Sequence, residues 1–244
     1  MKRAVPQAGT PRRIAARPRK SVIPCDELDQ VRARILAGAS EVRILDPGLS
    51  REYIRQRQER GLDQYDEVWE GVYVVPPLAN NPHQSLATAL ASILFYVINL
   101  ENRGQAQAGA NVSDRRDGWE HNYRDPDVVV VLNEGRAVDC GTHWMGGPDF
   151  LIEVQSPRDD TEEKIPFYSE LQVRELLVIH RDTRHLRLFR HDGEQLTLVA
   201  ESDPRGRCWL KSEVVPLSFR RKPGRGNPQV EVRRTDGQPG KWLL

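Results

Sequence analysis

Long hydrophobic segments are missing from this sequence of 244 residues. No stretch approaches the roughly 18 apolar residues that a membrane-spanning helix needs, so an integral membrane protein is not expected. The basic N-terminus is followed by no apolar segment, which argues against a secretory signal. We therefore predict a protein that does not associate with a membrane.

Cysteine is also scarce. The three cysteines, Cys25, Cys140 and Cys208, lie far apart, and none belongs to a CxxC pair. An odd number of cysteines at such spacing argues against a disulfide framework and against a cysteine zinc site. This usage is typical of the reducing cytoplasm, which is the location that we predict.

Several familiar catalytic motifs are absent as well. The sequence has no GxxxxGK[ST] phosphate loop, no GxGxxG dinucleotide fingerprint, no HExxH pair and no GxSxG nucleophile elbow. Its six histidines show no spacing typical of metal ligands. Metal chemistry through His or Cys is therefore disfavoured, and any metal is expected to be a hard cation held by carboxylates.

Charge is distributed unevenly along the chain. The formal net charge is only +1, but residues 1–20 carry seven Lys/Arg and no acid, and residues 220–244 carry seven Lys/Arg against two acids. The intervening residues 21–219 have a net charge of −11. This pattern predicts an acidic folded body between a disordered basic arm at 1–24 and a basic, solvated and partly disordered C-terminal tail at 220–244.

Hydrophobic periodicity predicts an α/β (α+β) protein. Helical spacing marks residues 26–37, 51–60, 82–101 and 160–173, and strand patterns mark 67–75, 106–112, 128–132, 150–154, 175–180, 185–190 and 195–200. The runs 128–132 and 150–154 are almost wholly apolar, as in central strands covered on both faces. We predict N-terminal helices at 25–62 and a main domain at 63–219 with a mixed central sheet flanked by helices.

Two acidic residues adjoin these apolar strands. Asp127 directly precedes the first, and Glu153 lies within the second. A carboxylate is costly to bury there unless it is paired, hydrogen-bonded or bound to a metal. Strand alternation places Glu153 and Gln155 on one face, where they converge with Asp127 if the strands are neighbours, and a divalent cation would relieve the repulsion between the two carboxylates. The alternative is that Asp127 caps a turn and Glu153 pairs with an arginine.

Lysine is rare in a chain so rich in arginine. The sequence has 30 arginines and six lysines, and the acidic body contains only Lys164 and Lys211. A lysine shortly after the Glu153 strand favours a site that needs a compact ammonium group. The alternative is a solvated helix charge that pairs with Glu163 or Glu170.

Six motifs in a fixed order carry a family resemblance. They are Glu67-x-x-Glu70-Gly71; Pro76-Pro77 with His83 opening a long helix; Asp125-Pro126-Asp127 with its valine run; the segment from Pro148 to Pro157; Glu163-Lys164 with Tyr168; and the apolar run at 173–179. Over roughly residues 50–200 the chain resembles a large bacterial family of predicted restriction endonucleases of unknown biological role. That family lies within the PD-(D/E)XK nuclease superfamily.

The resemblance implies a restriction-endonuclease-like fold and a metal-dependent endonuclease that hydrolyses phosphodiester bonds in DNA. Proteins of this superfamily hold Mg²⁺ (or Mn²⁺) on an Asp and a Glu, positions that Asp127 and Glu153 match, together with the backbone carbonyl of Val154. Gln155 stands where the usual motif has its Lys. Lys164 matches the variant in which that Lys lies on the following helix.

The resemblance leaves several roles open. Glu67 matches the family's early acid, with Glu70 as the alternative, and His83 either contacts phosphate or acts as a general acid, or merely begins a helix. The alternative function is a catalytically weak or inactive nuclease-fold protein that binds nucleic acid or a protein partner. A carboxylate metal site that serves structure alone is a third reading. The oligomeric state is also open, with a homodimer among the alternatives.

Overall fold

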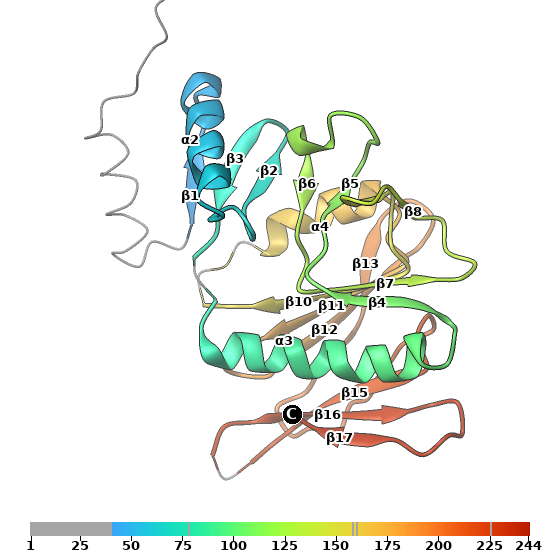
Figure 1. The fold of residues 1–244 in the computed structure, drawn as a ribbon. Coiled ribbons are helices and arrows are strands. Elements are labelled where there is room, and N and C mark those ends of the chain that lie inside the picture. The colour runs from blue at the N-terminus through green and yellow to red at the C-terminus, as the bar shows by residue number, and fades with distance from the viewer. Residues whose placement is uncertain (1–40, 78, 158, 160, 225) are drawn as a thin grey trace, which may run out of the picture.

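A computed structural model describes residues 41–77, 79–157, 159, 161–224 and 226–244, and its fold is α/β (Figure 1). At its centre lies a six-stranded sheet with the order β13-β12-β11-β10-β7-β4. Its strands are β4 (Gly104–Ala108), β7 (Val128–Leu132), β10 (Phe150–Gln155), β11 (Glu175–His180), β12 (Leu186–His191) and β13 (Leu196–Glu201). Only β10 and β11 run parallel, which confirms the predicted mixed sheet.

The two apolar runs of the sequence become the adjacent strands β7 and β10. All their residues except Leu132 and Gln155 are buried, because other layers cover both faces of the sheet. The antiparallel register pairs Ile152 with Val128. Residues directly opposite each other in such a ladder share a face, so Glu153 and Asp127 come next to one another at this end of the strands.

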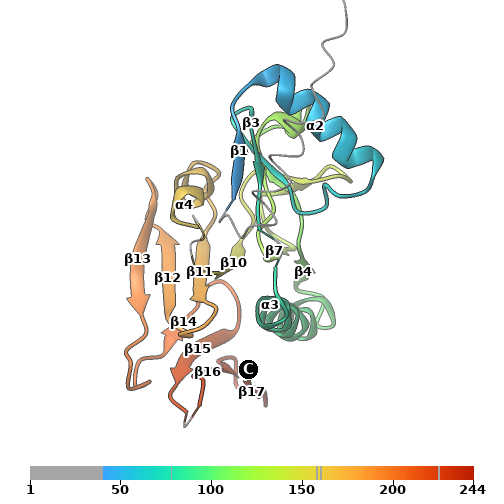
Figure 2. The ribbon, with the colours of Figure 1, turned by 90° about the vertical axis from the view of Figure 1, so that its left-hand side faces the viewer.

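Helices cover both faces of the central sheet (Figure 2). Helix α3 (Asn81–Leu94) begins at Asn80, whose side chain accepts a hydrogen bond from the third helical amide, and it continues as the π-helical turn η1 (Phe95–Asn99). The apolar face of α3 packs on the sheet residues Val130 and Ile152. Helix α4 (Thr161–Glu170) covers the opposite face through Phe167 and Tyr168.

A second sheet lies beside α4, with the order β1-β3-β2-β6-β5-β9-β8. Its strands are β1 (Val42–Ile44), β2 (Glu67–Trp69), β3 (Val72–Val75), β5 (Val112–Ser113), β6 (Tyr123–Arg124), β8 (Val138–Asp139) and β9 (Trp144–Met145). Helix α2 (Pro47–Glu59) packs against β1 and β3, and η2 (Trp119–His121) precedes β6. Because β1 pairs with β3, the described residues 41–62 belong to the main domain rather than to a separate helical segment.

The C-terminal residues form a third sheet, which corrects the expectation of a solvated tail at 220–244. Its strands are β14 (Leu210–Lys211), β15 (Leu217–Lys222), β16 (Gln229–Arg234) and β17 (Lys241–Leu243), in that order. Phe219, Val230 and Val232 are fully buried against α3 and the central sheet. Arg220, Lys222 and Arg233 alternate with these apolar residues along β15 and β16 and so lie on the opposite face of the sheet.

The remaining predicted elements coincide closely with observed ones. The helix expected at 51–60 corresponds to α2, the helix at 82–101 to α3 with η1, and the helix at 160–173 contains α4. The strand expected at 67–75 is the β2–β3 hairpin, and the strand expected at 106–112 divides into β4 and β5. The arm at 1–24 and the helix at 26–37 lie outside the described residues. No helix among the described residues is both long enough and apolar enough to span a membrane.

Candidate active site

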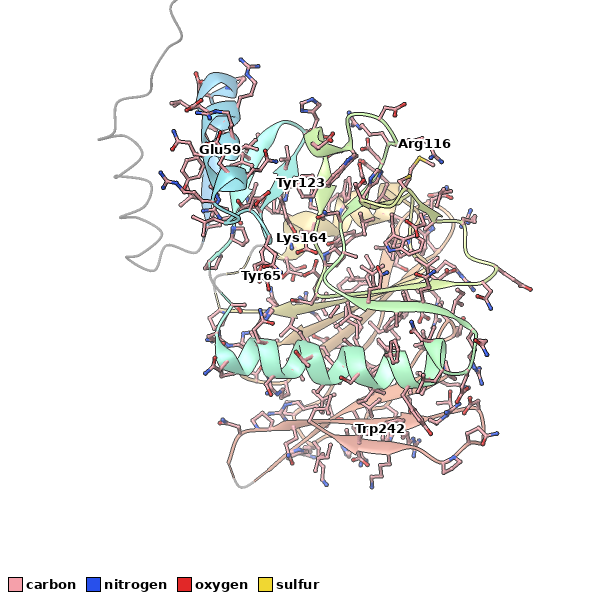
Figure 3. The ribbon with its side chains drawn as sticks, in the orientation of Figure 1. Glu59, Tyr65, Arg116, Tyr123, Lys164 and Trp242 are labelled. Carbon is pink, nitrogen blue, oxygen red and sulfur yellow. The ribbon has the colours of Figure 1, made fainter. Side chains whose placement is uncertain are left out.

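A cavity of about 590 Å³ opens where β2, the start of α3, the start of β7 and the end of β10 meet. Charged or ionisable side chains from these elements and from α4 line the cavity. They include Glu67, His83, Asp125, Asp127, Glu153 and Lys164. Lys164 lies in the interior, between the β2–β3 hairpin and the central sheet (Figure 3). Five segments that are distant in sequence therefore build one charged cavity.

Asp127 and Glu153 are positioned by the backbone of neighbouring strands. The Asp127 Oδ2 atom accepts a hydrogen bond of 2.7 Å from the Val154 amide, which fixes the start of β7 to β10. Glu153 is only 4% exposed, and its Oε1 accepts a hydrogen bond of 2.5 Å from the Tyr168 hydroxyl. The structure thus brings together the two carboxylates that the sequence predicts to converge.

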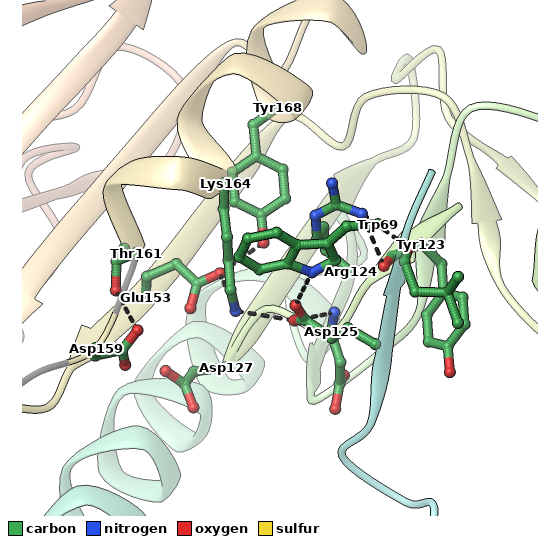
Figure 4. Close-up of polar contacts among 12 residues, drawn as sticks. Trp69, Tyr123, Arg124, Asp125, Asp127, Glu153, Asp159, Thr161, Lys164 and Tyr168 are labelled. Atoms are coloured by element: carbon green, nitrogen blue, oxygen red, sulfur yellow. Dashed lines mark hydrogen bonds and ion pairs between the residues drawn. The ribbon is translucent and has the colours of Figure 1, made fainter. Parts of the chain in front are cut away.

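Lys164 reaches this pair from the first turn of α4. Its Nζ atom donates to Glu67 Oε1 at 2.9 Å and to Glu153 Oε1 at 3.4 Å (Figure 4). These buried ion pairs decide between the two interpretations of Lys164, since the ammonium faces the cavity instead of pairing with Glu163 or Glu170.

Glu67 is the early acid that the fold places in the cavity. Besides the bond from Lys164, its Oε1 accepts one of 2.9 Å from the Asp125 amide, and its Oε2 accepts one of 2.6 Å from Trp69 Nε1. Glu70 instead occupies the β2–β3 turn with φ 49°, is exposed and does not line the cavity. The structure therefore favours Glu67 over Glu70.

Gln155 lies apart from the cluster, although alternation places it on the same strand face as Glu153. Its Oε1 atom accepts a hydrogen bond of 3.3 Å from Arg187, and it does not line the cavity. The Lys of the usual motif therefore has no counterpart at this position, and Lys164 is the lysine at the cavity.

His83 both begins a helix and meets the cluster. It is 8% exposed, and its Nε2 atom lies 3.4 Å from Asp127 Oδ2. Its Nδ1 is buried without a hydrogen-bond partner. Burial lowers the pKa of His83, but the hydrogen bond and charge of Asp127 outweigh it and raise that pKa above the usual value.

The carboxylates outnumber the cations in the cavity. Burial raises the pKa of Glu153 to about 8 against the opposing effect of Lys164, and the nearby Asp127 and Glu67 add to the rise. Burial and the charge of Glu67 raise the pKa of Asp125 to about 7. For Glu67 itself, Lys164 overcomes the effect of burial and lowers the pKa. Acidic side chains in the lining therefore exceed its three Lys and Arg side chains, Arg57, Lys164 and Arg181.

A family model described as Uma2, putative restriction endonuclease, matches residues 51–222. The chain belongs to the Uma2 family. This family is of the PD-(D/E)XK-like nuclease type, and the matched residues include every charged side chain of the cavity named above. The recognition made from the six motifs is thereby confirmed.

A solved structure and a search of curated proteins complete the comparison. The structure is described as a putative nuclease belonging to DUF820 from Anabaena variabilis, and it shares 16% sequence identity with this Uma2 protein at a TM-score of 0.48. The match covers 62% of this chain and 82% of that one. No curated protein matches the chain.

The donor atoms of the Uma2 cavity suit a hard divalent cation. Asp127 and Glu153 line the cavity with carboxylate oxygens, and the surplus of acidic side chains in the lining provides the negative charge that such a cation neutralises. No group of three or more His, Cys, Asp or Glu side chains in the described part of the chain forms a complete metal set.

Three residues shape the site through contacts that the sequence does not predict. Tyr168 holds Glu153, the Asp125 amide holds Glu67, and Trp69 donates to the same Glu67 carboxylate. Tyr168 follows Lys164 by four residues, a spacing that puts both on one helix face and offers a usable signal. Trp69 and Glu67 are two residues apart in β2 and share a face, whereas the Asp125 contact depends on pairing of β2 with β6, which no local pattern reveals.

Proposed function

We propose that this protein is a Mg²⁺- or Mn²⁺-dependent endonuclease that hydrolyses phosphodiester bonds in DNA. The convergence of Asp127, Glu153 and Lys164 in one cavity carries this proposal. The three come from β7, β10 and α4 and match the acid, acid and lysine positions of the superfamily. Membership of a nuclease family supports the same reaction class.

Asp127, Glu153 and the Val154 carbonyl would hold the cation. When bound, it would neutralise charge that develops on the phosphate and favour ionisation of the attacking water. The Val154 amide already fixes Asp127, and the Tyr168 hydroxyl fixes Glu153, so both carboxylates are oriented by the fold. Such preorganisation limits the rearrangement that binding requires.

Lys164 would act on the phosphate as a fixed positive charge. Its ammonium is anchored at 2.9 Å by Glu67 and lies 3.4 Å from Glu153, so it faces the position that the two proposed ligands share. A lysine there stabilises an anionic transition state and orients the attacking water by hydrogen bonding. Glu67 is a positioning residue in this scheme, because it contacts Lys164 rather than the substrate.

Cleavage of supercoiled plasmid tests the proposal. The wild-type protein is expected to nick or linearise plasmid in Mg²⁺ or Mn²⁺ but not in EDTA. Asp127→Asn and Glu153→Gln should each lower the rate at least about 10²-fold. The exposed acids Glu134 and Asp139 provide matched controls, since Glu134→Gln and Asp139→Asn remove the same charges outside the cavity.

Three outcomes would count against the proposal. Cleavage that persists in EDTA removes the role of the cation, and cleavage that survives both cavity substitutions removes the role of the cluster. Metal-independent DNA binding with no cleavage in any divalent cation favours the nuclease-fold binding module instead.

A further inference from the structure

The outer face of the C-terminal sheet is strongly basic. Strand alternation turns Val230 and Val232 inward and leaves five basic side chains on the opposite face: Lys211, Arg220, Lys222, Arg233 and Lys241. The one acid on the four strands β14–β17, as described, is Glu231. We call this surface, together with Trp209, the basic face.

Most of this charge is not neutralised within the protein. Glu231 forms ion pairs with Arg220 and with Lys241, whose Nζ lies at 3.0 Å. Lys211, Lys222 and Arg233 form no ion pair with any described residue, and Lys211 and Arg233 are exposed. The basic face therefore has a net positive charge that an anionic partner would satisfy.

Trp209 fixes part of this charge in place. The guanidinium carbons of Arg220 and Arg233 lie 4.5 Å and 3.8 Å from the centroids of its rings. Cation–π contacts of this kind restrict long side chains, and a planar guanidinium matches phosphate oxygens well. The two arginines are thus ordered before any ligand arrives, which lowers the entropic cost of binding.

The C-terminal sheet lies on the far side of the molecule from the second sheet, with α3 and the central sheet between them (Figures 1 and 2). Its apolar face packs on these elements, so the basic face is turned away from them. The cavity faces that second sheet and has an excess of carboxylates, so it attracts little polyanion by itself. A basic surface elsewhere on the fold supplies the attraction that the cavity lacks.

We propose that the basic face binds the phosphate backbone of duplex DNA without regard to sequence. The inference rests on the proposed function, which makes DNA the substrate. Duplex DNA carries one negative charge per roughly 1.7 Å of axis, so a flat array of Lys and Arg side chains can meet several phosphates at once. The face has one exposed apolar residue, Leu243, and thus little to insert into a lipid surface.

The salt dependence of binding tests this inference. We compare the wild type with the triple variant Lys211→Gln/Lys222→Gln/Arg233→Gln, using a 30-base-pair duplex in EDTA at several salt concentrations. The control variant, Arg51→Gln/Arg60→Gln/Arg116→Gln, removes three exposed charges outside the basic face. Each phosphate contact contributes roughly 0.9 to the slope of log K against log salt, so the first triple should flatten it by roughly two to three and the control by less than about one.

The outcomes separate this inference from the proposed function. Equal slopes for the two triple variants, with equal melting temperatures, would overturn the basic face as the DNA surface even if the wild type cleaves plasmid. No duplex binding by the wild type at low salt would overturn it too, as would binding to anionic vesicles alone. The remaining outcome is that the first triple variant weakens DNA binding but the wild type cleaves DNA with none of the divalent cations. That result would support the basic face and contradict the proposed endonuclease activity.

Discussion

The ammonium of Lys164 and the carboxylate of Glu67, 97 residues apart in sequence, meet at 2.9 Å in the buried cavity. This ion pair joins α4 to the β2–β3 hairpin and so links the two layers that enclose the site. It also places a positive charge beside Glu153, whose Oε1 lies 3.4 Å away. Structure and proposed chemistry therefore depend on the same contact.

Replacement of Lys164 should damage both activity and stability. Lys164→Met leaves Glu67 and Glu153 buried without their cation, which we expect to cost roughly 2–4 kcal/mol of unfolding free energy. The cleavage rate should fall at least about 10²-fold. Thermal melts and plasmid assays measure the two effects, and Arg51→Met is the control, because it removes an exposed cation outside both the cavity and the basic face. Wild-type activity in Lys164→Met would show that the lysine serves structure alone.

Paired substitutions separate the two early acids. Glu67→Gln removes the ion pair with Lys164 and replaces the carboxylate that accepts a hydrogen bond from Trp69 in the wild type with an amide. Lys164 should then be positioned less well, and the cleavage rate should fall about 10-fold or more. Glu70→Gln alters an exposed turn and should leave the rate within about twofold. Single-turnover rates of both variants decide the matter. Loss of activity in Glu70→Gln with none in Glu67→Gln would reverse the assignment.

Stability without metal should decrease as pH rises from about 5 to 8. Folding raises the pKa of Glu153 to about 8 and that of Asp125 to about 7. At pH values between the carboxyl pKa of the unfolded chain and these raised values, the folded state therefore binds more protons than the unfolded state, and stability falls as pH rises. The raised pKa of His83 acts in the same direction. Melting temperatures in EDTA should therefore fall across this range, and Glu153→Gln should flatten the decline. A rise with pH would contradict the buried-carboxylate account.

The attachment of the C-terminal sheet depends on a buried arginine. The Arg234 side chain is 2% exposed and bonds Glu101, just beyond η1, at 2.5 Å and Asp236 at 2.6 Å. Arg234→Met should destabilise the protein by roughly 2–4 kcal/mol, whereas Arg233→Met, on the exposed face of the same strand, should cost under about 1 kcal/mol. Urea unfolding measures the difference. Similar losses for the two variants would show that this ion-pair cluster does not hold the sheet.

Local patterns were sufficient for the central strands. The almost wholly apolar runs around Val129 and Ile152 predict strands buried on both faces. The sequence predicts that Asp127 and Glu153 converge if these strands are neighbours, and the structure shows that they are. Lys164 could be predicted as a site residue because lysine is rare in a chain so rich in arginine. Both signals are local in sequence, and the structure agrees with both.

The features that sequence reasoning missed depend on long-range contacts. Gln155 shares a strand face with Glu153, but its side chain bonds Arg187 of β12, which lies two strands away across β11. Val230 and Val232 alternate with Glu231 and Arg233 along β16, but the basic composition of residues 220–244 predicts a tail where the chain forms a sheet. In both cases a contact between strands that are distant in sequence is decisive, and composition alone does not identify it.

A crystal soaked in Mn²⁺ tests the central claim most directly. Asp127 and Glu153 are proposed to share one divalent cation, so anomalous density should occur between their carboxylates in the wild type and be lost in Asp127→Asn. Carboxylate oxygens each about 2.1 Å from that density would agree with the account. Density only elsewhere in a crystal of protein that cleaves DNA with Mn²⁺ would contradict it.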